Sequence, residues 1–135
     1  MEYKYIKTKI REIQRSFYYK LLNIHILSCG QGICELCFPV QDNAFNSGGN
    51  ISSGVLTTAS EMAIYIALYT MIPKEAVPLI ISIDTSMTIP INIGEVHINS
   101  RIIKLEDGIC FAEADVMDQN NISVAFSYFT LQIVE

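Results

Sequence analysis

Apolar residues near the start of the chain recur every three or four positions. One helix face would carry Ile6, Ile10, Ile13, Phe17 and Leu21. The basic residues of this segment mostly lie on the other faces, so the spacing predicts an amphipathic N-terminal helix over residues 1–22. We expect this helix to pack on the rest of the protein with its charges in water. Docking to a membrane surface or to a partner stays open as an alternative.

Two short apolar runs follow the helix. Ile24–Ser28 and Ile33–Phe38 flank Gly30-Gln31-Gly32, a glycine-rich turn between two β-prone segments. This arrangement predicts a β-hairpin, and Pro39 is expected to end its second strand.

The longest apolar stretch lies in the middle of the chain. Val55–Ile72 is apolar on nearly every side and predicts a buried helix that ends near Ile72-Pro73. The polar loop Asp42–Ser53 precedes this helix, and Ser52 or Ser53 can cap it.

The second half of the chain changes to a two-residue period. Apolar positions alternate with polar ones around Leu79–Met87, Val96–Ile102 and Cys110–Val116, with turns at Glu106-Asp107-Gly108 and Asp118–Asn121. This alternation predicts antiparallel strands with one side on a core. Ile122–Val134 is apolar on both faces and is expected to be central or to lie at a subunit contact. The whole pattern predicts an α+β fold, in which a curved antiparallel sheet wraps one long helix.

Composition narrows the classes of function. The 135 residues carry a net charge of −5, and half of them are apolar, so we expect one compact domain over residues 23–135 beside the N-terminal helix. Six of the nine basic residues lie in the first twenty positions, which leaves no broad basic face for nucleic acid. No secretory signal is visible, which favours a cytoplasmic protein. A membrane span is disfavoured because Glu61 would lie inside it.

The four cysteines do not predict a metal site. Cys34-x-x-Cys37 falls in a predicted strand, where residues three apart point to opposite faces, and His25 and His97 show no ligand spacing with it. We therefore expect reduced, buried or half-buried thiols, no metal and no cofactor.

Candidate chemistry centres on Glu61. It is the only charged residue between Asn43 and Ile72, and a carboxylate on an apolar helix is costly to bury unless it is paired or neutralised. Asn46, the glycines at 48 and 49, and Ser52-Ser53-Gly54 lead directly into its helix. Alternatively, Glu61 is a structural acid held by hydroxyl groups or a subunit interface, and Asn46 is a turn residue.

This loop and helix resemble those of hotdog-fold thioesterases of the phenylacetate-pathway (PaaI-like) type. That family has Asn-x-x-Gly-x-x-His-Gly-Gly, with an acid seven residues after the last glycine, and Asn46, Gly49, Gly54 and Glu61 match it. Ser52-Ser53 replaces the His-Gly, and Ile89 precedes the strand-end proline, Pro90.

The resemblance implies hydrolysis of an acyl- or aryl-CoA, with coenzyme A entering as part of the substrate. Glu61 would be the general base or nucleophile, and Asn46 would position the water or the carboxylate. Backbone N–H groups around Ser52, Ser53 and Gly54 would form the oxyanion hole.

The resemblance also implies a homodimer or homotetramer with its site between subunits, the acid of one helix facing the partner's loop. Candidate cations for the CoA phosphates are Lys74, Arg101 and Lys104. Since the His-Gly pair is missing, a non-catalytic hotdog module that binds acyl-CoA or acyl chains, or only assembles with partners, is the alternative.

Overall fold

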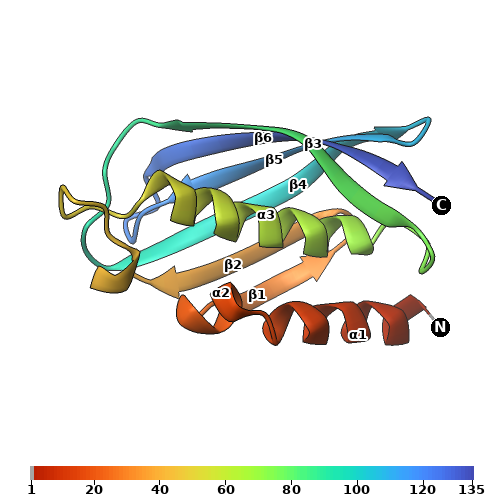
Figure 1. Ribbon diagram of the computed structural model, residues 1–135, viewed down its shortest axis with the longest axis horizontal. Coiled ribbons are helices and arrows are strands. Elements are labelled where there is room, and N and C mark those ends of the chain that lie inside the picture. Colours follow the sequence, from red (N-terminus) through yellow and green to blue (C-terminus); the bar gives the residue numbers. More distant parts are fainter. Residues whose placement is uncertain (1) are drawn as a thin grey trace.

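Six antiparallel strands form one sheet, and one long helix lies along one of its faces (Figure 1). The computed structural model describes the backbone of residues 2–135, and their side chains apart from residues 2–4 and 43. The helices are α1 (Glu2–Gln14), α2 (Phe17–Leu21) and α3 (Ser53–Tyr69), with a 3-10 turn at Asp42–Ala44. The strands are β1 (His25–Gly30), β2 (Ile33–Pro39), β3 (Val77–Met87), β4 (Glu95–Glu106), β5 (Ile109–Met117) and β6 (Ser123–Val134).

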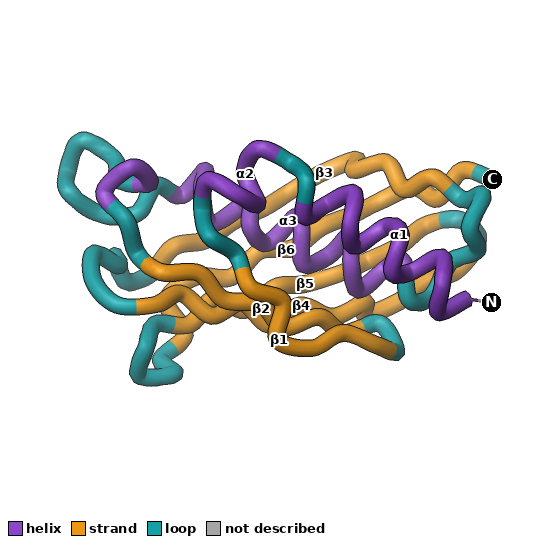
Figure 2. Tube along the Cα trace, turned by 90° about the horizontal axis from the view of Figure 1, so that it is seen from below, coloured by secondary structure: helices purple, strands orange, loops and turns teal. Residues whose placement is uncertain are grey.

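The strand order is β1-β2-β4-β5-β6-β3, so β1 and β3 are the two edges of the sheet. We call the sheet face turned toward α3 the inner face, and the opposite one the outer face. In the view of Figure 2 β1 and β2 lie below the helices and β3 lies at their level, so the sheet curves around α3. This is the predicted α+β arrangement, with the additional N-terminal helix beside α3.

The long helix owes its position to its small and branched apolar residues. Leu56, Ala59, Ala63, Ile64 and Ala67 are fully buried, and α3 packs chiefly on β4 and β2. The helix ends at Tyr69, three residues before the expected end. Its C-cap Thr70 donates a hydroxyl hydrogen bond to the carbonyl of Ala67 (2.6 Å) and accepts one from the N–H of Gly32 (2.8 Å). The end of the helix is thereby tied to the turn between β1 and β2.

The predicted hairpins are confirmed. Gln31 and Gly32 both have positive φ (51° and 77°), as a two-residue turn between twisted strands requires. Strands β4 and β5 follow the predicted alternation, with Val96 and Ile98 buried on β4 and Cys110–Val116 buried at every second residue. Strand β6 lies between β5 and β3, which agrees with its expected central place.

Strand β3 departs from the predicted pattern. A bulge between Ile80 and Ser82 shifts its register, so Ile80 and Ile83 lie opposite the inner-face residues Leu131 and Phe129. The alternation predicted Leu79 and Ile81 on the core side, yet they are 49% and 57% exposed. A bulge inserts one residue, and the period of two therefore changes face at that point.

The N-terminal helix also differs from the prediction. Arg15 and Ser16 separate α1 from α2, so the stripe does not continue. Ile10 and Ile13 are half-buried against the core, whereas Phe17 is 69% exposed and Leu21 is exposed as well. No helix within residues 2–135 is both long enough and apolar enough to cross a membrane. The cytoplasmic location stays a prediction.

Candidate functional site

Glu61 lies on α3 one turn after Thr57, a residue that contacts the edge strand β3. Thr57, on the same stripe of the helix, shares a 2.8 Å hydrogen bond with Thr85 of β3. The Glu61 carboxylate is half-buried and makes no hydrogen bond or ion pair with a described residue. Burial therefore raises its pKa without compensation from a nearby cation. A raised pKa makes this carboxylate a stronger proton acceptor than an exposed glutamate.

The loop before α3 is organised by Asn46 and Ser52. The side-chain carbonyl of Asn46 accepts hydrogen bonds from the N–H groups of Gly48 (2.8 Å) and Asn50 (3.3 Å). Its amide nitrogen makes no hydrogen bond with a described residue and stays available as a donor. Ser52 is the N-cap of α3, and its hydroxyl accepts from the N–H of Gly54 at 3.2 Å. Capping by a serine at this position confirms the prediction.

A second loop lies beside this one. The Ile51 N–H donates to the Ile91 carbonyl at 2.8 Å, so residues 88–95 adjoin the loop that carries Asn46. These two segments, far apart in the chain, therefore meet near the N-terminal end of α3.

Asn46 and Glu61 make no hydrogen bond with each other among the described residues. Glu61 lies eight positions after Ser53, the first residue of α3, which is about 12 Å along the helix axis. Glu61 therefore lies about two helical turns from the end of α3 that the loop approaches.

Aromatic rings continue the Glu61 stripe toward α1. Tyr65 follows Glu61 by one turn, and its ring stacks on Tyr69 with centroids 6.2 Å apart. Tyr69 meets the edge of Tyr5, and the ammonium of Lys9 lies 5.4 Å from the centre of the Tyr69 ring. Burial raises the pKa of Tyr65, and the Glu61 carboxylate raises it further. The acid thus borders an aromatic surface that joins α3 to the N-terminal helix.

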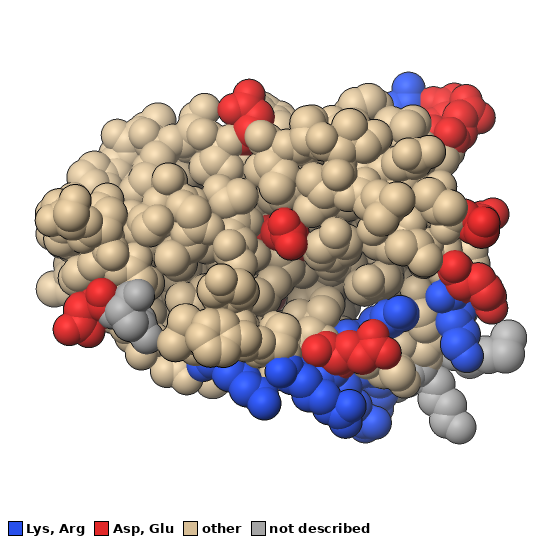
Figure 3. Space-filling model, viewed as in Figure 1, with Lys and Arg blue, Asp and Glu red and all other residues tan. Residues whose placement is uncertain are grey.

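The three cations proposed for CoA lie apart from one another. Arg101 and Lys104 are on the outer face, opposite Glu113 and Phe111 of β5. Arg101 pairs with the Glu113 carboxylate, and Lys104 lies 3.0 Å from Glu106. Lys74 is exposed beyond the C-terminal end of α3 and makes no ion pair with a described residue. Figure 3 places most visible basic side chains along the edge of the molecule that α1 and α2 occupy, and few charges over α3.

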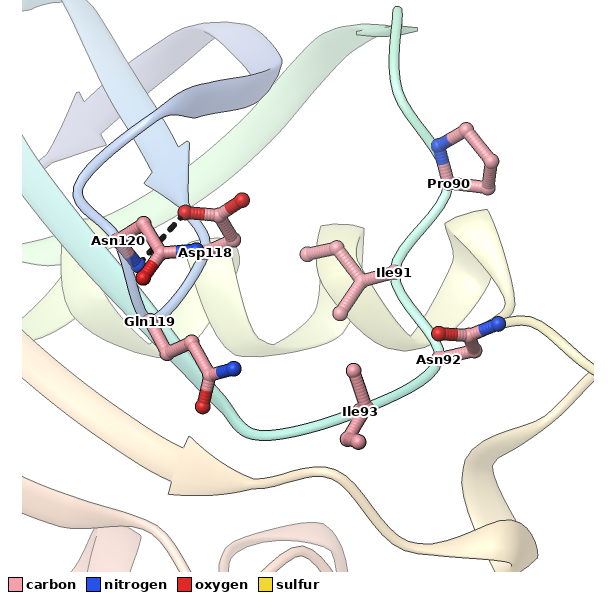
Figure 4. A pocket seen from close by; sticks show the side chains of 7 residues that line it. All are labelled: Pro90, Ile91, Asn92, Ile93, Asp118, Gln119 and Asn120. Carbon is pink, nitrogen blue, oxygen red and sulfur yellow. Dashed lines mark hydrogen bonds between the residues drawn. The ribbon is translucent and has the colours of Figure 1, made fainter.

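Two pockets of the described residues lie away from Glu61. Figure 4 shows the smaller, about 110 Å³, between the Pro90–Ile93 loop and the turn in which the Asp118 carboxylate accepts from the N–H of Asn120 (2.8 Å). The larger, about 340 Å³, is bordered by Met71, Leu105 and Ile133. Neither includes Asn46 or Glu61.

Sequence reasoning missed two polar groupings that strand pairing creates. The hydroxyl of Thr85 bonds both to Thr57 and to buried Ser127 of β6, each at 2.8 Å, which ties α3 to two strands. On the outer face, Cys37 of β2 lies opposite His97 of β4. No spacing along the chain reveals either group, because strand register and the packing of α3 on the sheet bring the partners together.

Comparison with solved structures agrees with the architecture. The PaaI protein of the phenylacetic acid degradation operon of E. coli superposes with a TM-score of 0.86 over 99% of this chain and 96% of its own, at 13% identity. A thioesterase from Haemophilus influenzae gives 0.85 over 93% and 88%, at 19% identity. A thioesterase family protein from Silicibacter pomeroyi gives 0.86 over 96% and 98%, also at 19% identity.

This chain has the hotdog fold. Helix α3 and the six-stranded sheet form the hotdog core, and α1 and α2 precede them in the chain. The superpositions establish the fold. Because the sequence identities are only 13–19%, the activity has to be argued from the residues of this chain. Neither the protein-family models nor the sequences of curated proteins match this chain.

Proposed function

We propose that this hotdog protein is an acyl-CoA thioesterase that acts as a homo-oligomer. The observation that carries the proposal is the Glu61 carboxylate, half-buried and unpaired among the described residues, with its pKa raised by burial. An unpaired acid on an apolar helix is a cost to folding that a role in catalysis would explain. The fold shared with thioesterases supports the same reaction class.

In this proposal Glu61 takes a proton from a water molecule, and the hydroxide adds to the thioester carbonyl. The C–S bond then breaks, and the CoA thiolate leaves and takes up a proton. Alternatively, the carboxylate attacks the carbonyl itself, and water hydrolyses the resulting anhydride. The free amide nitrogen of Asn46 in the partner's loop would position the water or the carboxylate.

The oxyanion hole would use backbone N–H groups at the start of α3. The N–H of Ser53 has no partner among the described residues, as expected at the first helical position. The N–H of Gly54 donates to the Ser52 hydroxyl and would have to exchange that bond for the thioester oxygen. Positive charge at a helix N-terminus favours the developing oxyanion.

Edge strand β3 supports assembly with a second copy. Its edge has no strand partner in the described chain, and Val77, Leu79, Ile81 and Ile83 are between 39% and 57% exposed. A long apolar edge strand invites pairing with another chain, and Thr57, one turn before Glu61 on α3, is hydrogen-bonded to this strand. We therefore propose a dimer through β3, alone or within a tetramer, with the acid of one subunit facing the loop of the other.

The assembly is tested with one lysine at each edge of the sheet. Ile81→Lys on β3 is expected to give a folded monomer in analytical ultracentrifugation and to lose hydrolysis. Leu27→Lys on β1, at a residue that is similarly exposed (54%), is expected to keep both oligomer and activity. An unchanged oligomer in Ile81→Lys contradicts the β3 interface.

The activity is tested on acyl-CoAs of short, medium, long and aryl type. Glu61→Gln keeps size and hydrogen bonding but removes the base, so hydrolysis is expected to fall by about 10²–10⁴-fold. Glu35→Gln, the same change on an exposed outer-face residue, is expected to have no effect. Full activity in Glu61→Gln would refute the proposed role.

Lys74 is the proposed contact for a CoA phosphate, since Arg101 and Lys104 are each paired with a carboxylate. Lys74→Gln is expected to raise KM and leave kcat unchanged. An unchanged KM contradicts this contact.

One observation favours a second function. The Gly54 N–H already donates a hydrogen bond to the Ser52 hydroxyl, so one of the two proposed oxyanion-hole donors is engaged within the protein. A hotdog module that binds acyl-CoA or acyl chains without hydrolysing them, or only assembles with partners, would have this feature. Acyl-CoA binding by a folded oligomer that hydrolyses none of the substrates supports this alternative and contradicts the enzyme.

A further inference from the structure

Strand register lines up sulfur and imidazole groups across the outer face. His25 of β1 lies opposite Cys37 of β2, Cys37 lies opposite His97 of β4, and His97 lies opposite Met117 of β5. Directly opposed residues of neighbouring strands project to the same side of a sheet. Both histidines of the chain and one of its four cysteines therefore share one row on the outer face.

Three groups at the centre of this row converge. One ligand atom each of Cys37, Glu95 and His97 lies within 4.8 Å of the other two. The Nε2 atom of His97 lies 3.1 Å from a carboxylate oxygen of Glu95. In a tetrahedral zinc site, bonds of about 2.0–2.3 Å place ligand atoms roughly 3.5 Å apart. Atoms up to 4.8 Å apart need to approach by only about 1 Å, and the His97–Glu95 pair already lies within that spacing.

The chemistry of the three donors selects the ion. Thiolate, imidazole and carboxylate together are the ligands of Zn²⁺, whereas Mg²⁺ and Ca²⁺ prefer oxygen alone.

We propose that Cys37, Glu95 and His97 form a Zn²⁺ site on the outer face, with water in the fourth position. The expectation that the chain binds no metal came from spacing along the sequence, and these ligands come together only across two strands. The ion joins β2 to β4. The site is separate from Glu61, which belongs to α3 on the other face of the sheet, so it does not depend on the proposed hydrolysis.

The test uses the full-length chain without a histidine tag, first stripped with a chelator. Zn²⁺ is titrated against a chromophoric competitor, and Co²⁺ serves as a spectroscopic probe of the thiolate. We expect one ion per chain, a thiolate-to-cobalt charge-transfer band, release of about one proton per ion at neutral pH, and a higher Tm. Mg²⁺ is expected to produce none of these effects.

Variants decide which side chains hold the ion. Cys37→Ser is expected to abolish the charge-transfer band, and His97→Gln and Glu95→Gln to weaken Zn²⁺ binding at least about tenfold. Cys29→Ser is the matched control, because Cys29 is an exposed thiol on β1 outside the cluster, and it should bind as the parent does. Circular dichroism checks folding. If Cys37→Ser does not fold, the Zn²⁺ affinity of Glu95→Gln tests the proposal instead, because Glu95 is exposed and its replacement should not disturb folding.

Two outcomes overturn the proposal. One is a folded parent protein that takes up no Zn²⁺ from the competitor. The other is Zn²⁺ binding as tight as the parent's in Cys37→Ser or Glu95→Gln, or binding that is lost in Cys29→Ser.

Discussion

The two faces of the sheet hold their polar groups in different ways. On the inner face, the hydroxyls of Thr57, Thr85 and Ser127 form a chain between α3 and two strands, surrounded by apolar residues. On the outer face, ion pairs such as Arg101–Glu113 and the Cys37–Glu95–His97 cluster depend on strand register alone. A polar group on the inner face thus depends on the packing of the helix, and one on the outer face depends on strand pairing.

The largest expected difference between the faces is the stability lost when a phenylalanine on each face is replaced by alanine. Phe129 on the inner face is 1% exposed, and Phe111 on the outer face is 45% exposed. Phe129→Ala is expected to lower the free energy of unfolding by about 3–5 kcal/mol because it leaves a cavity. Phe111→Ala is expected to cost below about 1 kcal/mol. Equal losses of unfolding free energy in the two variants, measured by urea denaturation, would contradict the difference between the faces. They would indicate that a second subunit covers the outer face.

The hydroxyl chain is expected to have the next largest effect. Thr85→Val keeps the shape of the side chain but leaves the fully buried Ser127 hydroxyl without that partner, at a cost of about 1–3 kcal/mol. Thr130→Val, on the outer side of neighbouring β6, is the control and is expected to change stability little. Thermal unfolding compares the two variants. Equal Tm values would mean that the hydroxyl chain adds nothing to the inner face.

A smaller effect is expected at the start of α3. Ser52→Ala removes the hydroxyl that caps the N–H of Gly54 and is expected to cost about 1 kcal/mol. Ser53→Ala removes a neighbouring hydroxyl that makes no such bond and is expected to be nearly neutral. Denaturant unfolding of both variants measures the cap. A neutral Ser52→Ala would mean that water replaces the cap without loss.

The smallest effect concerns Glu61 and changes with pH. In the unfolded chain Glu61 is ionised at neutral pH, whereas burial in the folded chain disfavours the ionised form, so the carboxylate opposes folding. Glu61→Gln is expected to stabilise the protein at pH 7 by less than about 1 kcal/mol, since water screens a half-exposed carboxylate.

The same reasoning gives the direction of the pH dependence. Below the ordinary pKa of glutamate, about 4.3, the Glu61 side chain is neutral in both the folded and the unfolded chain. The stability gained by Glu61→Gln should therefore vanish there. Tm values of the parent and the variant between pH 3 and 8 check this. A loss of stability in the variant at pH 7 would instead mean that the carboxylate has a partner, such as a residue of a second copy.

The hairpins, the long helix and the alternating strands were predictable because each depends on neighbours in the chain. The turn at Gln31-Gly32, the cap at Ser52 and the buried alternation of Cys110–Val116 are local consequences of residue type. The candidate acid was also predictable, since a single carboxylate on an apolar helix is visible in the sequence.

The errors lay where distant contacts override local pattern. The bulge after Ile80 turned Leu79 and Ile81 away from the core, and the break at Ser16 left Phe17 exposed. Strand register also placed Arg101 and Lys104 on the outer face, where each pairs with a glutamate.

The sequence by itself determined the elements, their order and the presence of one acid on the buried helix. Tertiary structure alone decided that Thr57 of α3 meets Thr85, that β3 is an edge, and that Cys37 lies opposite His97. The physical reason is that periodicity records which face of an element is apolar, whereas strand order and register decide which distant faces meet.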